Sequence, residues 1–293
     1  EQHGPDAIAI YGSGQLLTED YYVANKLMKG FIGTANIDTN SRLCMSSAVV
    51  AHKRAFGEDI VPCNYEDLEH TDLLILTGSN AAWTHPVLFQ RIERAKLRNP
   101  DMKVVVVDPR ETDSCSLADL HVALKPGTDA VLFCGLLNYL AHHNSLDDTF
   151  IQNSTNGFAE ALAEVSAWTV AKVAETCDVP VAVIELLFNW FTSLPRAITF
   201  FSMGINQSTS GVDKGNAIIN CHLASGKIGK EGSGPFSITG QPNAMGGREV
   251  GGLSNMLAAH MDIDNPQHHA TVKAFWQAPN LITKPGLRAV DMF

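Results

Sequence analysis

The amino-acid sequence predicts an α/β fold with two Rossmann-like lobes of mostly parallel sheet, one lobe inserted in the other. Two observations support this prediction. Short runs of leucine and β-branched residues alternate with longer helical patterns, and small polar turns follow the runs. Buried runs separated by helices are typical of a parallel sheet covered on both faces. Right-handed crossovers then bring the turns to one edge, where such folds bind ligands.

The first half of the chain supplies four of the expected strands. Thr18 follows the first strand and begins a helix that we expect to end at Gly30. The strands are expected at residues 8–11, 73–76, 104–107 and 122–124, and two further helices at residues 86–97 and 129–142.

The second half is more helical at first and then rich in glycine. Residues 156–190 predict helices only, a strand is expected at 199–201, and a helix follows to about Ser225. The segment 240–252 holds many glycines and predicts an irregular loop. We assign residues 1–15 and 195–293 to one discontinuous lobe and residues 16–194 to the inserted lobe.

Composition excludes several classes of protein. The chain is 45% hydrophobic with a formal net charge of −10, which gives no broad electrostatic surface for nucleic acid. No apolar run reaches the length of a membrane span. No two of the six cysteines stand at C-x-x-C spacing, which excludes a local zinc or iron–sulfur motif, and the unlike contexts of the cysteines indicate a reducing compartment. The first residue is not Met, and we expect a fragment of a longer protein.

Four of the expected strands end in small polar turns that suit a phosphate or a nucleotide. Glycine allows close approach of a backbone, and the following helix offers free N–H groups. An ordinary connection between a strand and a helix is the alternative for each turn, and neither common nucleotide fingerprint is present. The turns are Gly12-Ser13-Gly14-Gln15, Gly78-Ser79-Asn80, Asp108-Pro109-Arg110 and Met203 to Gln207.

Individual residues in these regions have two interpretations each. Asp108 and Asp129 suit a ribose or a guanine edge, or they cap helices. Cys44 stands where a polar run meets a helix start, with Arg42 nearby, so we expect a lowered pKa and a thiolate, the form that ligates soft metals or attacks as a nucleophile. A small buried residue is the alternative for Cys44. Arg248 is the sole cation of its segment, and Glu249, an oxyanion or a phosphate is its expected partner.

Four segments together resemble the molybdenum nitrate reductases of the dimethyl sulfoxide reductase superfamily, in order and over nearly the whole chain. The resemblance is closer to the assimilatory branch, because Ser208-Thr209-Ser210 stands where periplasmic relatives usually have an arginine. The segments are residues 36–48, Gly78-Ser79-Asn80 with His85-Pro86, residues 203–207 and residues 240–252.

The resemblance implies a bis-molybdopterin guanine dinucleotide cofactor with molybdenum, and it implies that the inserted lobe binds a guanine dinucleotide. By this likeness Cys44 is the metal ligand, and Met45 and Arg248 lie beside the substrate channel. The residues implied to contact the cofactor are Gln15, Asn40, Thr77, Gly78, Ser79, Asn80, Asp108, Arg110, Gly127, Thr128, Asp129, Met203 and Gln207.

The resemblance also implies an activity and partners. The expected reaction is the reduction of nitrate to nitrite by oxygen-atom transfer, in nitrate assimilation and in the cytoplasm. The expected electron donor is ferredoxin, flavodoxin or an NAD(P)H-linked reductase subunit. A 4Fe-4S cluster is expected only in an N-terminal domain outside this sequence. Neither nucleic acid nor a membrane is an expected partner.

Four alternatives remain from the sequence, and the absent fingerprint glycines argue against one of them, a plain dinucleotide-binding module. A periplasmic-type nitrate reductase is one, and a formate dehydrogenase is another, although that group often has selenocysteine, or Cys followed by His, where this chain has Cys44-Met45. A non-catalytic relative, such as the large subunit of respiratory complex I, is the third, and the presence of Cys44 argues against it.

Overall fold

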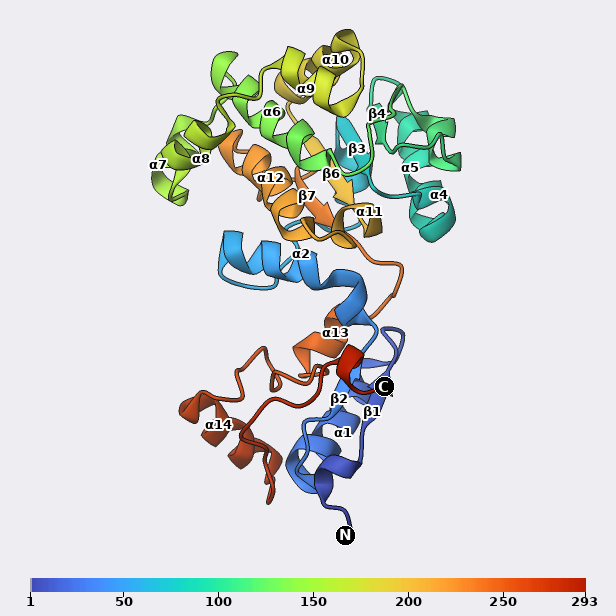
Figure 1. The fold of residues 1–293 in the computed structure, drawn as a ribbon. Helices are drawn as coiled ribbons and strands as arrows, with labels where there is room; N and C mark the ends of the chain where they lie inside the picture. Colours follow the sequence, from blue (N-terminus) through green and yellow to red (C-terminus); the bar gives the residue numbers. More distant parts are fainter. Residues whose placement is uncertain (1) are drawn as a thin grey trace. The chain divides into compact units, whose positions relative to one another are not determined.

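The computed structural model describes residues 2–293 and divides the chain into two compact units. Unit 1 consists of the chain up to Ser46 together with Thr239–Phe293, and unit 2 consists of Ser47–Ile238. Both units combine helices with parallel strands (Figure 1), which confirms the α/β class. No helix among residues 2–293 is both long enough and apolar enough to cross a bilayer.

Unit 2 is built on a five-stranded parallel sheet with the order β5-β4-β3-β6-β7. Thr77 lies opposite Val107 and Phe201, and Phe201 lies opposite Ser237, so the carboxyl ends of four strands line up. The strands are β3 (Leu73–Thr77), β4 (Lys103–Val107), β5 (Leu120–Val122), β6 (Ala197–Phe201) and β7 (Gly234–Ser237).

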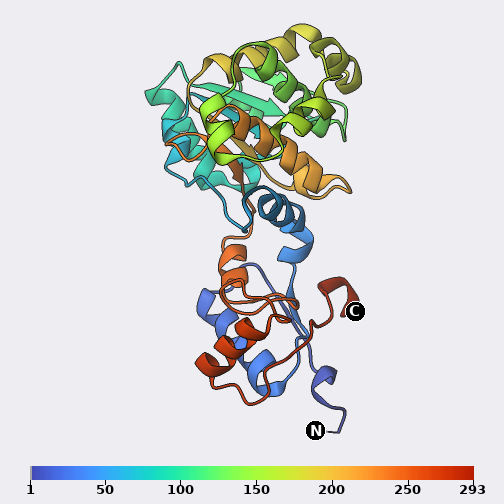
Figure 2. The ribbon, with the colours of Figure 1, turned by 90° about the vertical axis from the view of Figure 1, so that its left-hand side faces the viewer.

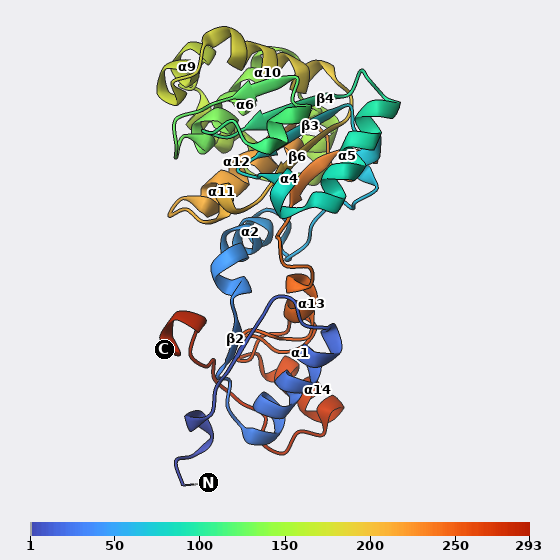
Figure 3. The ribbon, with the colours of Figure 1, turned by 90° about the vertical axis from the view of Figure 1, so that its right-hand side faces the viewer.

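Helices cover both faces of this sheet. Helix α5 (Pro86–Arg98) packs Phe89 and Ile92 against strand residues such as Leu74. Helices α6 (Asp129–His142) and α12 (Gly211–Ala224) lie on the other side (Figure 3). The remaining helices are α3 (Asp67–His70), α4 (Ala81–Thr84), η3 (Asp113–Leu117), α7 (Asp148–Ser154), α8 (Phe158–Val165), α9 (Val170–Cys177), α10 (Val181–Ser193) and α11 (Met203–Asn206).

Unit 1 joins the first residues of the chain to the last. Figure 2 shows these blue and red segments side by side. A two-stranded parallel sheet pairs β1 (Ile10–Gly12) with β2 (Ile37–Thr39), and Trp276 and Leu257 belong to a buried apolar cluster. The helices are η1 (Pro5–Ala7), α1 (Thr18–Asn25), the π-helix η2 (Lys26–Ile32), α13 (Ala244–Glu249), α14 (Pro266–Trp276) and η4 (Ala289–Asp291). Helix α2 (Ser41–Phe56) begins in unit 1 and ends in unit 2.

Several expected boundaries differ from the structure. Strand β6 belongs to the sheet of unit 2, because its residues are fully buried between β3 and β7, so the first lobe does not resume at residue 195. The helix expected to end at Gly30 continues to Ile32, where Gly33 takes a left-handed conformation (φ 89°). The segment 240–252, expected to be irregular, contains α13, and strands β2 and β7 were not expected at all.

Candidate functional site

The turns that follow β3 and β6 meet at two glycines. Gly204 donates its N–H to the carbonyl oxygen of Gly78 at 2.9 Å, and Gly78 has a φ of 57°. A Cβ on Gly204 would lie 2.6 Å from the Cα of Gly78, so no side chain fits at this contact. The predicted segments Thr77–Asn80 and Met203–Gln207 are therefore neighbours at one edge of the sheet.

Buried hydroxyl groups gather along the same edge. Thr77, Ser79 and Ser237 have side-chain oxygens that are buried and, among residues 2–293, lack a hydrogen-bond partner. A buried polar group without a partner costs about 1–3 kcal/mol. Hydroxyls of this kind beside a glycine contact suit a ligand rich in oxygen and phosphate, so the edge fits the dinucleotide that the sequence implied.

Asp108 and Arg110 follow β4 and form a tight turn. The Oδ1 atom of Asp108 accepts the backbone N–H of Arg110 at 2.9 Å, and the Asp108 carbonyl oxygen lies 2.9 Å from Nε2 of His121. Asp108 is half-buried and Arg110 is exposed. The carboxylate thus stabilises the turn, and the guanidinium of Arg110 stands in solvent, where a ligand can reach it.

Asp129 forms a buried ion pair at the start of α6. Its Oδ2 atom lies 2.7 Å from Nζ of Lys214, and the two side chains are 10% and 4% exposed. Thr128 and Gly127, which precede Asp129, are more exposed, and Gly127 has a φ of 89°. Sequence reasoning missed Lys214, because 84 residues separate it from Asp129 and no local motif marks it.

In unit 1, the turn after β1 is held by residues from two distant segments. The buried Gly14 donates its N–H to Oδ1 of Asn40 at 3.0 Å and accepts the N–H of Asn243 at 3.1 Å. A Cβ at Gly14 would lie 1.9 Å from Oε1 of Gln241. The structure thus brings Asn40 to this turn, while Gln15 at its end is exposed.

Cys44 lies in the first turns of α2 and is half-buried. Its Sγ atom is 3.2 Å from Oγ1 of Thr239. Burial raises the pKa of the thiol, while the hydrogen bond with Thr239 and the charge of Arg248 oppose that rise. The expected lowered pKa is therefore wrong for this structure. The guanidinium of Arg42 binds Asp38 (2.5 Å) and Asn255 (2.6 Å), and the cation whose charge lowers the pKa of the thiol is Arg248.

Arg248 and Met45 lie in the same unit as Cys44. Arg248 is 6% exposed on α13, with Nη1 3.4 Å from the carbonyl oxygen of Ala244, and Met45 is buried. Glu249, one of the expected partners of Arg248, is exposed. Met203 and Gln207, in contrast, belong to unit 2.

The donor set around Cys44 has a chemical consequence. Residues 2–293 contain no group of three His, Cys, Asp or Glu side chains placed to hold a metal ion. A metal ligated by Cys44 would therefore take its further donors from a bound cofactor, which fits a soft metal held by sulfur atoms of a pterin.

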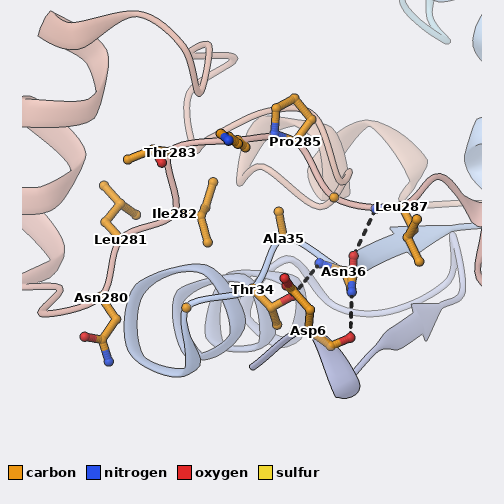
Figure 4. A pocket seen from close by; sticks show the side chains of 13 residues that line it. Asp6, Thr34, Ala35, Asn36, Asn280, Leu281, Ile282, Thr283, Pro285 and Leu287 are labelled. Carbon is orange, nitrogen blue, oxygen red and sulfur yellow. Dashed lines mark hydrogen bonds between the residues drawn. The ribbon is translucent and has the colours of Figure 1, made fainter. Parts of the chain in front are cut away.

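A separate cavity of about 650 Å³ lies in unit 1, away from the residues implied by the sequence. Figure 4 shows that the side chain of Asn36 links its walls, donating to the carbonyl oxygen of Asp6 at 3.1 Å and accepting the N–H of Leu287 at 2.9 Å. Its lining is made of residues 33–36 and 280–287 together with Asp6, and none of them is an implied cofactor contact.

The sequence is similar to nitrate reductases of several bacteria. The sequence is 58% identical over 293 residues to a nitrate reductase of Klebsiella oxytoca and 47% identical over 292 residues to one of Synechocystis. It is 40% identical over 306 residues to a periplasmic nitrate reductase of Desulfovibrio desulfuricans. The chain is covered to at least 99% in each case but spans 33%, 41% and 40% of these relatives.

The fold and the family also match. The acetylene hydratase of Pelobacter acetylenicus shares the fold, with a TM-score of 0.66 over 77% of this chain and 30% of that one, at 23% identity. The sequence model of the molybdopterin oxidoreductase family matches residues 1–292. The chain is therefore a member of the molybdopterin oxidoreductase family.

Proposed function

We propose that this chain is the central part of a molybdenum-dependent nitrate reductase in which Cys44 ligates the metal. One observation carries the proposal: the half-buried thiol of Cys44 lies in the field of the buried Arg248. A thiolate beside a fixed cation suits a soft metal that meets an anionic substrate. Relatives that are 47–58% identical over the chain and carry the name nitrate reductase support the substrate.

The cofactor of this proposal is a bis-molybdopterin guanine dinucleotide. When bound, it supplies the two-electron redox chemistry of oxygen-atom transfer from nitrate. The Gly78 turn offers its backbone and the hydroxyls of Thr77 and Ser79 to phosphates. Asp108 directly follows β4, and Asp129 is the first residue of α6. The guanosine end of the cofactor is expected to bind beside these two residues.

The remaining implied residues act beside the Cys44 site or along the edge that binds the dinucleotide. Asn40 fixes the Gly14 turn of unit 1, and the exposed Gln15 at the end of that turn is the proposed contact to the ligand. Arg248 attracts nitrate and orients it, because a planar guanidinium matches a trigonal oxyanion. The buried Met45 lies beside the substrate channel in this proposal. The other residues of the binding edge are Asn80, Arg110, Gly127, Thr128, Met203 and Gln207.

The proposed role is nitrate assimilation in the cytoplasm, with ferredoxin, flavodoxin or an NAD(P)H-linked reductase subunit as electron donor. Ser208-Thr209-Ser210 supports the assimilatory branch over the periplasmic one. The 4Fe-4S cluster of this proposal lies in a domain outside the sequence.

Two variants of the complete enzyme test the proposal. Cys44→Ser should abolish nitrate reduction and molybdenum ligation while thermal stability changes little, because a hydroxyl is a harder donor than a thiolate. Arg248→Lys should raise the KM for nitrate, because the charge remains but the planar fork is lost.

Cys115→Ser is the matched control, since Cys115 is also half-buried but follows β4 in unit 2. It should reduce nitrate like the parent enzyme. Near-normal turnover and molybdenum spectra in Cys44→Ser would refute the metal-ligand assignment.

A further inference from the structure

Lys29 is a fully buried lysine in the π-helix η2 of unit 1. Its Nζ atom donates to three backbone carbonyl oxygens of one loop: Gly251 at 2.6 Å, Leu253 at 2.7 Å and Met256 at 2.7 Å. An ammonium group is the one side-chain donor that offers three N–H bonds from a single atom. The three carbonyls and the lysine therefore form a matched set.

The charge of Lys29 is costly at this position, which argues that it has a specific task. Burial lowers the pKa of Lys29 to about 7, the carboxylate of Asp38 opposes this, and the charge of Arg42 adds to it. A methionine would fill the same space without this cost. The gain from Lys29 must come from the loop it holds.

The loop continues directly from the helix that carries Arg248. Gly251 donates its N–H to the carbonyl oxygen of Arg248 at 3.0 Å, and Gly252 donates to Gly247 at 2.6 Å. Since the carbonyl oxygen of Gly251 also accepts from Lys29, a single residue, Gly251, links the ammonium to the carbonyl oxygen of Arg248. The loop is compact there, because a Cβ on Gly251 would lie 2.6 Å from the carbonyl carbon of Leu257.

The same loop is tied to the helix that carries Cys44. Asn255 accepts from Nη2 of Arg42 at 2.6 Å, and Arg42 precedes Cys44 by two residues in α2. Asp38 fixes Arg42 from β2 through an ion pair of 2.5 Å. The loop is thus fixed at one end beside Arg248 and at the other beside Cys44.

We infer that Lys29 is a positioning residue for Arg248: by holding residues 251–256 through three carbonyls, it fixes the guanidinium relative to Cys44. This inference rests on the proposed function, because it takes Arg248 as the residue that binds nitrate. Lys29 touches neither substrate nor metal in this role.

The test compares Lys29→Met with Lys227→Met in the complete, molybdenum-loaded enzyme. Lys227 is a matched control, since it is also buried and donates to two carbonyls, those of Phe191 (2.6 Å) and Leu194, but in unit 2. Lys29→Met should raise the KM for nitrate about fivefold or more with kcat changed far less. Lys227→Met should lower thermal stability and leave that KM unchanged.

Hydrogen exchange gives a readout that does not depend on turnover. The amides of Gly251 and Gly252 should exchange faster in Lys29→Met and at the parental rate in Lys227→Met. Unchanged exchange at these amides overturns the inference. A parent enzyme that reduces no nitrate would refute the proposed function instead, and the exchange result would still report whether Lys29 holds the loop.

If Lys29→Met does not fold, Lys29→Arg tests whether Lys29 positions Arg248. A guanidinium keeps the charge but cannot direct three N–H bonds from one atom to three carbonyls. The KM for nitrate should rise in this variant too. An unchanged KM for nitrate in a folded Lys29 variant overturns the inference.

Discussion

Gly78 and Gly204 touch through their backbones: the N–H of Gly204 donates to the carbonyl oxygen of Gly78 at 2.9 Å. The two residues lie in turns after adjacent parallel strands that are separated by more than a hundred residues of sequence. Because neither has a side chain, the turns approach more closely than any other pair of residues would allow. This contact sets the spacing of the edge that we propose for the dinucleotide.

Gly204→Ala should destabilise unit 2. Its Cβ would lie 2.6 Å from Gly78 Cα and 3.0 Å from Gly78 O, and overpacking of this kind costs about 1–3 kcal/mol. Denaturant unfolding measures the loss. Gly240→Ala is the control, because its Cβ meets nothing within 4 Å, and it should change stability by about 0.5 kcal/mol or less. Equal stability of the two variants would contradict the close contact.

Lys214→Met should destabilise the protein by about 3–5 kcal/mol, because it leaves the carboxylate of Asp129 buried without its cation. Arg54→Met provides the comparison. Arg54 pairs with Asp213 at 3.1 Å, but those side chains are 58% and 73% exposed, so about 0–1 kcal/mol is expected. Urea unfolding distinguishes the two. A loss in Lys214→Met no larger than that in Arg54→Met would show that the buried pair does not stabilise the fold.

His222 should make the protein sensitive to acid. Its ring is fully buried, with Nδ1 3.0 Å from the carbonyl oxygen of Lys227 and Nε2 2.8 Å from Oγ1 of Thr199. This geometry assigns the neutral ring with its proton on Nδ1, since a carbonyl can only accept. Burial lowers the pKa of His222 from 6.5 to about 3.

The sign of the effect follows from proton binding. Below pH 6.5 the unfolded chain takes up a proton at His222 that the folded protein does not bind, so stability falls as pH drops from about 6.5 toward 3. The full loss from this group is on the order of 5 kcal/mol, because each unit of pKa difference is worth about 1.4 kcal/mol. Unfolding curves of His222→Gln should lack this part of the pH dependence, whereas the exposed His143→Gln should retain it. Parallel pH profiles for His222→Gln and the parent protein would contradict the prediction.

The sequence predicted the elements whose signals are local. Strand β3 and helix α6 lie where their apolar patterns place them, because a fully buried run and a long apolar helix each have an unambiguous pattern. Strand β7 was missed because Gly234 and Pro235 are poor strand residues, and an edge strand tolerates them. Helix α13 was missed because Gly246 and Gly247 disfavour a helix, although both are buried where a side chain would clash.

The candidate site shows the same division. The turns after the strands and Cys44 could be found in the sequence, since short motifs mark them. Lys29, Thr239 and Lys214 could not, because the partners of the first two are 195 to 227 residues away and the partner of Lys214 is 85 residues away. The pKa of Cys44 was predicted in the wrong direction for a related reason: burial of the thiol depends on the packing of distant segments.

The hydrogen bond between Cys44 and Thr239 has a further consequence for how such a chain could have arisen. Cys44 stands two residues before the chain leaves unit 1, and Thr239 is the first residue after its return. The exit and the re-entry thus lie within a side chain's reach of each other, so a linker of about three residues could join them. Unit 2 is in this respect an inserted domain. Evolution could gain, enlarge or exchange such a domain at one position of unit 1 while the fold of unit 1 stays intact.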